Sequence, residues 1–461
     1  MTDDDRRAMA DGRRATADAQ RFTAREAVDL IALARDFTEL PAPVGEYGPD
    51  GPLSWHGYDA SRARAAARTG EEESVVCGTA TVGGTPAVLI SFEFGFLGGS
   101  LGERTGDRLE AAYTYAREHR LPVVSLVATG GSRMQEGMLA LVQLQRVARQ
   151  SALNRQAGLP QISVLRDPTT GGGWATLGAG ADVILALPGA QVGFAGSRVR
   201  PPDADPAAYT AEAQLAAGAI DAVVPPEELP GLLGLWLRLL TRPSTAEAPP
   251  PAALGDTSLP ATGWHAVQQA RSPQRPCAQA YLDAYFTHRA PLSGDRGGGT
   301  DAGMLCGFGE HDGRTVAYAA QTGTATRPAG YRTAARLIRL AGQLRIPVLT
   351  LVDTPGAAND AEAERQGAGA AIAELFGAVA SARTPITTLL IGEGGSGGAL
   401  ALAAPDNTWA TPDSYFSVIA PELAAAILKR PAGEVRATAD QLRIRPQDLV
   451  ELGVVKGIVD T

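Results

Sequence analysis

The fold is decided by RLPVVSLVATGG, residues 120–131, and by a second copy of the same segment, RIPVLTLVDTPG, residues 345–356. The two copies align without a gap at an offset of 225 residues. The same offset continues along the chain and pairs Pro160 with Pro385, Gly172 with Gly397, and Gly173 with Gly398. An internal repeat of this kind predicts that both halves of the chain share one plan.

Each half has the pattern helix, buried strand, glycine turn, helix, buried strand, glycine turn, helix. The runs VVSLVA and VLTLVD are almost continuously apolar, which favours strands covered on both faces in a parallel or mixed sheet. The helix before the second copy places Leu337, Leu340, Ala341 and Leu344 on one face. The sequence therefore predicts an α/β protein with two related domains.

Composition shifts along the chain predict where these domains begin and end. Residues 1–65 form an N-terminal helical appendage, and a first domain covers residues 66–241. Residues 242–263, RPSTAEAPPPAALGDTSLPATG, are rich in Pro and Ala and are the predicted linker. A second domain covers residues 264–461.

Overall composition excludes several classes of protein. The chain has 461 residues, of which 44% are hydrophobic, so general disorder is excluded. The formal net charge is −9, which argues against a nucleic-acid partner. No apolar run of about 18 residues occurs, and the first 20 residues have no apolar core, so we expect neither a membrane span nor a secretory signal.

The three cysteines, Cys77, Cys277 and Cys306, lie far apart and match neither a zinc spacing nor a disulfide framework. A reducing, cytoplasmic setting is therefore predicted. The histidines show no HxxxH or HExxH spacing, so no metal site is expected.

Four glycine turns, each between a strand and a helix, are the candidate functional elements. They are ATGGSRMQEG (128–137), RDPTTGGGWATL (166–177), DTPGAANDAEAERQG (353–367) and GEGGSGGALAL (392–402). Helix N-termini offer free N–H groups and a partial positive charge. Two such turns that converge make an oxyanion hole, which stabilises an enolate or a similar oxygen anion.

Other motifs have weaker support. GGSGG, residues 394–398, matches a nucleophile elbow, but no histidine follows it, as an α/β-hydrolase requires. GGSLG, residues 98–102, also matches, yet no later histidine is preferred. Arg133 and Glu136 are spaced for a helix ion pair as much as for a substrate contact. Asp353 could be a base or a helix cap.

The long motifs resemble the carboxyltransferase component of acetyl-CoA carboxylase, in the crotonase superfamily, with a beta-like half followed by an alpha-like half. The beta-like motifs include FEFGFLGGSLGERTGDRLEAA (92–112) and ISVLRDPTTGGG (162–173). The alpha-like motifs include VQQARSPQRPCAQAYLDAYF (267–286) and YFSVIAPELAAAILKR (415–430). The resemblance implies two crotonase-like (ββα-superhelix) domains.

The resemblance also implies the activity, which is transfer of a carboxyl group from carboxybiotin to the α-carbon of an acyl-CoA, such as acetyl-CoA. The beta-like half would hold the thioester enolate on backbone N–H groups, and the alpha-like half would hold the biotin ureido oxygen. The implied catalytic residues are Gly130, Gly131, Gly172 and Gly173 in the first half and Gly356, Ala357, Gly397 and Gly398 in the second. The implied substrate-binding residues are Gly98, Gly99, Ser132, Arg133, Phe194, Ala195, Gly196 and Gly395.

Partners and departures follow from the same resemblance. The chain has no biotinylation site and no ATP-grasp module, so we expect a separate biotin carboxylase and a separate biotin carboxyl carrier protein. Fusion of the halves suggests a homodimer in place of the family's heterotetramer. The resemblance also implies a role in fatty acid or polyketide biosynthesis. The family's four-cysteine zinc ribbon is missing, and Gln321 stands where alpha subunits typically have lysine. Two alternatives stay open, a biotin-independent malonyl-thioester decarboxylase and a non-catalytic assembly subunit.

Overall fold

The structure, a computed structural model, describes residues 21–33 and 36–460. It divides this part of the chain into two compact units. Unit 1 holds the described residues up to Gln214 together with Ala222–Arg238, and unit 2 holds Leu215–Asp221 together with the chain from Leu239 onward. The first 20 residues of the predicted appendage, for which no secretory signal is expected, lie outside the described residues.

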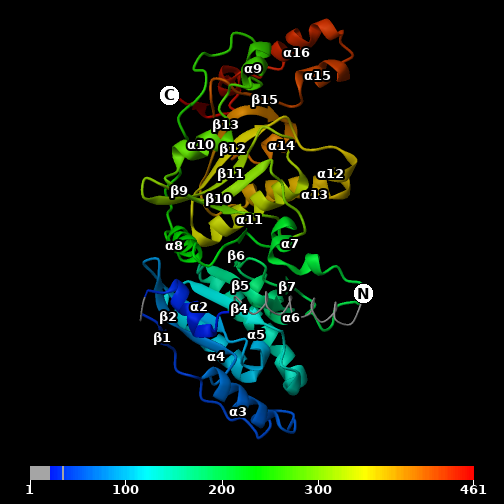
Figure 1. Cartoon of the computed structure of the whole chain (residues 1–461). Coiled ribbons are helices and arrows are strands. Elements are labelled where there is room, and N and C mark those ends of the chain that lie inside the picture. Colours follow the sequence, from blue (N-terminus) through cyan, green and yellow to red (C-terminus); the bar gives the residue numbers. More distant parts are fainter. Residues whose placement is uncertain (1–20, 34–35, 461) are drawn as a thin grey trace. The chain divides into compact units, whose positions relative to one another are not determined.

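Unit 1 is built on a mixed sheet that has eight strands within the described residues (Figure 1). The strand order is β1-β2-β3-β4-β5-β6-β8, and β7 pairs with β5. The first two pairings are antiparallel and the others are parallel. The strands are β1 (Thr38–Glu39), β2 (Val75–Val82), β3 (Thr85–Phe92), β4 (Val123–Thr129), β5 (Gln161–Thr170), β6 (Val183–Ala186), β7 (Val192–Gly193) and β8 (Ala222–Val223).

The helical elements up to Leu240 lie between these strands or flank them. They are α2 (Ala24–Ile31), α3 (Tyr58–Thr69), η2 (Leu97–Gly99), α4 (Glu103–His119), η3 (Met134–Glu136), α5 (Gly137–Gln156), α6 (Gly171–Gly173), η4 (Trp174–Gly178), η5 (Pro206–Tyr209), α7 (Ala211–Ala216) and α8 (Leu229–Leu240). Helix α4 packs on β2 and β3 and against α5.

Unit 2 repeats the plan, again with an eight-stranded sheet within its described residues. The order is β16-β14-β13-β12-β11-β10-β9, and β15 pairs with β13. The strands are β9 (His288–Leu292), β10 (Met304–His311), β11 (Arg314–Gln321), β12 (Val348–Thr354), β13 (Ile386–Gly395), β14 (Thr408–Ala410), β15 (Tyr415–Ser417) and β16 (Gly457–Ile458). The helical elements are α9 (Gly263–Ala270), α10 (Ala278–Tyr285), α11 (Pro328–Leu344), α12 (Ala361–Arg365), α13 (Ala368–Ala380), α14 (Ser396–Leu400), α15 (Pro421–Ile427), η6 (Ala432–Glu434), α16 (Val435–Gln441) and α17 (Pro446–Glu451).

The predicted repeat is confirmed in two central strands of each sheet and in the helix that precedes them. Strands β4 and β12, strands β5 and β13, and helices α4 and α11 have the same bounds when 225 is added. Both helices end in a left-handed cap, at Arg120 with φ +54° and at Arg345 with φ +57°. The interruption in strand pairing also recurs, between Val127 and Thr129 and between Val352 and Thr354.

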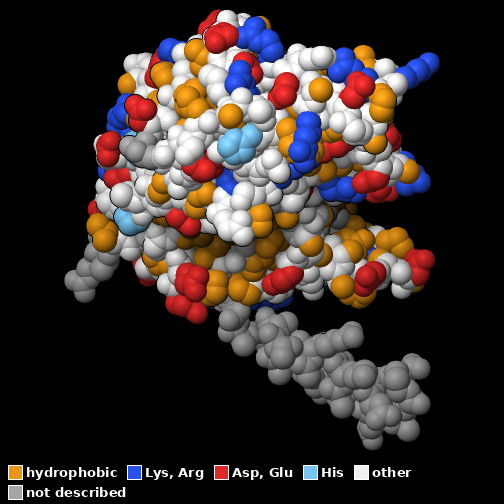
Figure 2. All heavy atoms as spheres, turned by 90° about the horizontal axis from the view of Figure 1, so that it is seen from above, with side chains coloured by type: hydrophobic (Ala, Val, Ile, Leu, Met, Phe, Trp, Pro, Cys, Tyr) orange, Lys and Arg blue, Asp and Glu red, His pale blue; other side chains and the backbone are white. Residues whose placement is uncertain are grey.

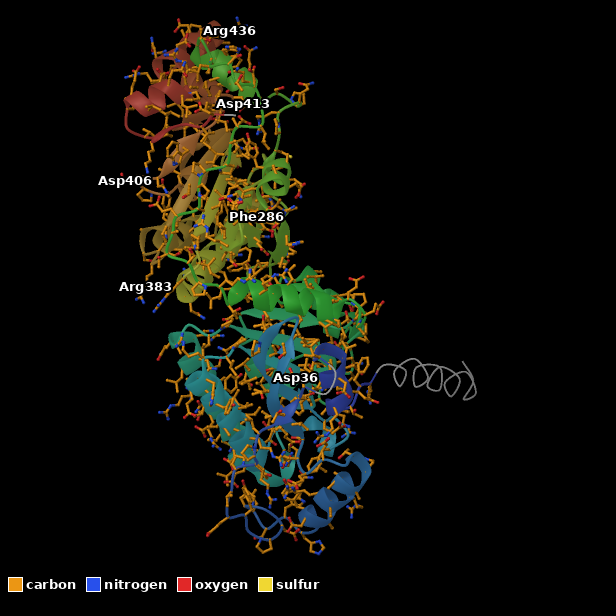
Figure 3. The ribbon with its side chains drawn as sticks, turned by 90° about the vertical axis from the view of Figure 1, so that its left-hand side faces the viewer. Asp36, Phe286, Arg383, Asp406, Asp413 and Arg436 are labelled. Atoms are coloured by element: carbon orange, nitrogen blue, oxygen red, sulfur yellow. The ribbon has the colours of Figure 1, made fainter. Side chains whose placement is uncertain are left out.

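The strand β12 is buried along its whole length, as its continuous apolar run predicts. Leu349 and Leu351 join a core cluster that includes Tyr281 of α10 and Phe286. Phe286, labelled in Figure 3, packs on Tyr318 with ring centroids 5.3 Å apart. Because successive residues of a strand point to opposite faces, the residues of β12 that alternate with Leu349 and Leu351 lie on the opposite face of the sheet.

Helix α11 packs on β10 and β11 of the same sheet and against α13.

The predicted linker, residues 242–263, is tied to unit 2 by hydrogen bonds. The N–H of Ser244 donates to the Arg345 carbonyl at 2.8 Å, and the N–H of Ala253 donates to the Asp460 carbonyl at 2.9 Å. Its high Pro and Ala content therefore accompanies an extended segment that packs along a folded unit.

The described residues contain no helix that is long and apolar enough to cross a membrane. Figure 2 shows acidic and basic side chains interspersed among hydrophobic ones over the visible face of the protein. This face therefore has no large patch of only acidic or only basic side chains.

Candidate active site

The first glycine turn of unit 1 follows β4, and its two glycine N–H groups have acceptors within the protein. The N–H of Gly130 donates to the Gly98 carbonyl at 2.9 Å, and the N–H of Gly131 donates to the Thr129 hydroxyl at 3.0 Å. An N–H that already has an acceptor within the protein is not free to bind a ligand. A donor for a ligand at this turn therefore has to be sought at a neighbouring residue.

Ser132 is that neighbour. The N–H of Leu101 donates to the Gly131 carbonyl at 2.9 Å, and the N–H of Arg133 donates to the Leu101 carbonyl at 2.8 Å. These bonds make a parallel bridge between Leu101 and Ser132. In such a bridge the residue between the two bonded neighbours directs its own N–H to the opposite side. The Ser132 N–H therefore points away from Leu101.

The second turn of unit 1 meets the first. Gly171 adopts φ +62°, and its N–H donates to the Phe194 carbonyl at 3.0 Å. A Cβ atom added to Gly171 would lie 3.1 Å from the Cα of Gly131, so the turns approach closely. Gly172 and Gly173 open the following helical turn, where N–H groups have no intrahelical acceptor.

The first turn of unit 2 has the same hydrogen-bond pattern. The N–H of Thr326 donates to the Gly356 carbonyl at 3.2 Å, and the N–H of Ala358 donates to the Thr326 carbonyl at 2.9 Å. Thr326 and Ala357 form the parallel bridge. The Ala357 N–H thus points away from Thr326, as the Ser132 N–H points away from its bridge partner in unit 1.

The second turn of unit 2 closes on this donor. A Cβ atom added to Gly398 would lie 2.5 Å from the Ala357 nitrogen, and one added to Gly395 would lie 2.0 Å from the Pro355 carbonyl oxygen. A Cβ atom at Gly397 would meet no atom within 4 Å, so space is open on that side. Ala357 and the start of α14 therefore share one small region.

The predicted substrate-binding residues of unit 1 flank its two turns. A Cβ atom at Gly99 would lie 2.1 Å from the Ala128 carbonyl oxygen, and one at Gly196 would lie 3.5 Å from the Thr170 hydroxyl. The Phe194 side chain is exposed. The adjoining Ala195 carbonyl accepts a hydrogen bond from Arg200 at 3.0 Å.

Arg133 is buried below the first turn and is not on an exposed surface. Its Nη2 donates to Oε1 of Glu73 at 2.5 Å, and its Nη1 donates to the Tyr58 hydroxyl at 3.1 Å. Glu136 lies 3.7 Å from Arg133, so of the two readings that the sequence left open for these residues the structure shows the ion pair. Burial alone would raise the pKa of Glu73, but Arg133 lowers it below its ordinary value. These contacts hold the turn in place.

Sequence reasoning missed Glu73 and Tyr58. Glu73 precedes Arg133 by 60 residues, and Tyr58 belongs to the predicted appendage. No local spacing links them to the glycine turn. Only the tertiary fold brings these side chains together.

Asp353, which the sequence left open as a base or a cap, is an ion-paired residue at the end of β12. Arg275 Nη2 donates to its two oxygens at 3.1 Å and 2.9 Å, and the N–H of Glu393 donates at 3.1 Å. Burial raises its pKa, although Arg275 opposes the shift. Both side-chain oxygens of Asp353 are therefore already bonded to other groups of the protein.

The described residues contain no group of three or more His, Cys, Asp or Glu side chains that could hold a metal ion. The paired turns offer backbone N–H groups at Ser132 and Ala357. This arrangement can stabilise an oxygen anion in each unit.

Comparisons with known proteins identify relatives of both units. A family model described as "Carboxyl transferase domain" matches residues 51–223. A second, described as "Acetyl co-enzyme A carboxylase carboxyltransferase-like", matches residues 257–461. The fold also resembles that of the transcarboxylase 12S core, with a TM-score of 0.78 and 21% identity over 100% of this chain and 93% of that one. The two family models thus point to a carboxyltransferase, and the fold likeness indicates two crotonase-like halves.

Similar proteins are more specific. The protein of Salinispora arenicola named "Acetyl-coenzyme A carboxylase carboxyl transferase subunits beta/alpha" is 40% identical over 92% of this chain and 79% of its own length. A protein of the same name from Clostridium tetani is 33% identical over 88% and 74%. The chain therefore belongs to the acetyl-CoA carboxylase carboxyltransferase family with fused beta and alpha subunits, and the predicted family and enzyme class are confirmed.

A "Probable biotin-dependent acyl-coenzyme A carboxylase beta3 subunit" of Mycobacterium bovis is 35% identical over 87% of this chain and 83% of its own length. This similarity extends beyond the fused beta/alpha proteins and places the chain among biotin-dependent acyl-CoA carboxylases.

Proposed function

We propose that the chain transfers a carboxyl group from carboxybiotin to the α-carbon of an acyl-CoA, with an oxygen anion held on backbone N–H groups in each unit. The observation that carries this proposal is repeated in both units: one N–H points away from its bridge partner, at Ser132 and at Ala357, beside the glycine-rich start of a short helix, Gly171–Gly173 in unit 1 and Ser396–Gly398 in unit 2. Carboxybiotin supplies the carboxyl group and, after its release, a basic ureido nitrogen that can take the α-proton.

In unit 1, the proposed ligand is the thioester oxygen of the acyl-CoA. Removal of the α-proton places negative charge on this oxygen, and the N–H groups of Ser132, Gly172 and Gly173 would stabilise it. Loss of one such donor typically lowers a rate by about 10²–10³. Because the N–H groups of Gly130 and Gly131 have acceptors within the protein, we assign the donor of this turn to Ser132 in their place.

In unit 2, the proposed ligand is the ureido oxygen of biotin. The residues present fit this group, because the Ala357 nitrogen adjoins Gly398 and the space at Gly397 is open. A neutral carbonyl oxygen suits backbone donors, which need no charged partner. Polarising this oxygen weakens the bond between the ureido nitrogen and the carboxyl group.

The test uses the reverse direction. The pure protein is incubated with malonyl-CoA or methylmalonyl-CoA, with and without free biotin, and loss of the carboxyl group is measured. Biotin-dependent loss is the expected result. Loss that is independent of biotin would support a malonyl-thioester decarboxylase instead, and no turnover by a folded protein would support an assembly subunit.

We infer further that a biotin carboxylase and a biotin carboxyl carrier protein act with this chain, and that it forms a homodimer. The self-association is supported by apolar side chains exposed on α5, among them Met138, Leu141 and Val142. Light scattering of the pure protein is expected to give twice the chain mass of 47.6 kDa. A mass of one chain at micromolar concentration would contradict the homodimer.

A further inference from the structure

A buried amide connects the two turns of the unit 2 site. Gln321 is the last residue of β11 and is fully buried. Its Nε2 donates to the Gly398 carbonyl at 3.2 Å and to the Thr326 hydroxyl at 3.2 Å. Gly398 belongs to α14, while Thr326 forms the bridge with Ala357. The side chain is therefore bonded directly to the segment that starts α14 and, through the Thr326 hydroxyl, to the residue that bridges to Ala357.

The amide is only half satisfied in this position. Its Oε1 atom is buried and has no hydrogen-bond partner among the described residues. An unpaired buried acceptor destabilises a fold relative to an apolar group of the same shape. Stability alone therefore does not favour glutamine here.

Unit 1 has an apolar residue at the equivalent position. Val88 of β3 pairs with Val123, and Ala317 of β11 pairs with Val348, which is the repeat counterpart of Val123. Four residues further along each strand, Gln321 therefore occupies the place of Phe92. Phe92 is also fully buried. An apolar residue is thus compatible with this fold at the end of the strand, and the amide serves something particular to unit 2.

We propose that Gln321 is a positioning residue that fixes the spacing between the Ala357 N–H and the start of α14. This inference rests on the proposed function, because the spacing matters only if both segments hold the ureido oxygen. Oxyanion donors act at 2.7–3.1 Å from the oxygen, so a shift of about 0.5 Å in one segment weakens the site.

The experiment compares the wild type with Gln321→Met, which keeps the side-chain length and removes both hydrogen bonds. Biotin-dependent decarboxylation of malonyl-CoA gives kcat and KM, and calorimetry gives Tm. We expect kcat to fall about tenfold, which is about 1.4 kcal/mol. KM for malonyl-CoA should stay unchanged, and Tm should stay within about 3 °C. If this variant does not fold, Gln321→Leu replaces it, since Phe92 shows that the position accepts an apolar side chain.

The matched control is Thr384→Val. The Thr384 hydroxyl is buried and donates to the Ile346 carbonyl at 2.7 Å, just before β13 and β12 begin, at the opposite ends of these strands from the turns. This variant should lower Tm and leave kcat unchanged. A wild-type kcat for Gln321→Met, or a kcat loss that Thr384→Val reproduces, would overturn the inference. If the wild type itself shows no biotin-dependent turnover, the proposed function fails and this inference fails with it.

Discussion

Glu72 and Glu73 are neighbours in the chain with opposite surroundings. The Glu73 side chain is 1% exposed and pairs with buried Arg133, whereas the Glu72 side chain is 85% exposed and lies 3.1 Å from Arg108. Removing one partner of a buried pair leaves an uncompensated charge, while an exposed pair is screened by water. The two glutamates should therefore differ strongly in their effect on stability.

Glu73→Ala is expected to lower the free energy of unfolding of unit 1 by about 3–5 kcal/mol, because the buried Arg133 guanidinium would lose the carboxylate to which it is hydrogen-bonded, leaving only Glu136 at 3.7 Å. Glu72→Ala, the matched control, should change it by no more than about 1 kcal/mol. Urea unfolding measures both. Equal effects of the two substitutions would contradict the structural role given to Arg133.

The same pair predicts a pH dependence. Arg133 holds the pKa of Glu73 below its ordinary value. A carboxylate of this kind stabilises the fold fully above its unfolded pKa of about 4.3, and the contribution is lost as the pH falls through the lower folded value. The stability difference between the wild type and Glu73→Gln should thus be constant from pH 8 to about pH 5. A decline that starts near neutral pH would be inconsistent with the lowered pKa.

Residue-scale prediction from sequence worked only over short distances. The three-residue spacing of Arg133 and Glu136 left an ion pair and a substrate contact open, and the structure shows the ion pair at 3.7 Å, although Arg133 itself is extended and lies just before a short helical turn. The stronger partner, Glu73, has no local signal, since only the fold brings it beneath the turn. Asp353 shows the same limit, because Arg275 lies 78 residues earlier in the chain.

The paired strands and helices were predictable because each is marked by a continuous apolar run or an apolar face. The direction of the backbone N–H groups was not, because it depends on the isolated bridges at Leu101 and Thr326. The offset of 225 residues does not extend to the part of each unit that precedes α4 and α11. The connection to α4, residues 93–102, is four residues longer than the connection to α11, residues 322–327. Gly98 and Gly99 lie in this longer connection.

Ser396 offers a test of the turn before α14. It adopts φ +59°, at the position where unit 1 has Gly171 with φ +62°. A left-handed conformation costs a residue with a side chain about 1–2 kcal/mol, part of which glycine loses again through the entropy of the unfolded chain. Ser396→Gly should therefore stabilise unit 2 by about 0.5–1 kcal/mol, as measured by denaturant unfolding.

The reciprocal substitution is the control for this prediction. Gly171→Ser would add a Cβ atom 3.1 Å from the Cα of Gly131 and should destabilise unit 1. Destabilisation by Ser396→Gly would show that the serine side chain contributes more than its backbone conformation costs.

The two units do not follow a single cut in the chain. Leu215–Asp221 belongs to unit 2 although unit 1 continues at Ala222. Asp221 is buried and accepts from Arg336 Nη2 at 2.9 Å and from the Ser293 N–H at 3.0 Å, and it also pairs with Arg296. The sequence prediction placed the division at the Pro- and Ala-rich segment, because composition carries no trace of a short segment that crosses between folded units.

Asp221→Ala should lower the stability of unit 2 by about 3–5 kcal/mol, because two arginines would lose a buried carboxylate. Hydrogen exchange of the two units, followed by mass spectrometry, measures this effect. Protection should fall in β10, β11 and α11 and stay unchanged in β4 and β5. Uniform loss of protection across both sheets would contradict the assignment of Asp221 to unit 2.

The placement of Asp221 bears on how such a gene could be divided. A break within residues 242–263 would leave Arg296 and Arg336 on one polypeptide and their carboxylate on another. If the halves were translated separately, Arg296 and Arg336 of the second would lack the Asp221 carboxylate until the first had associated with it. Fission just ahead of Leu215 would instead deprive the first product of its edge strand, β8. The fused gene avoids both outcomes.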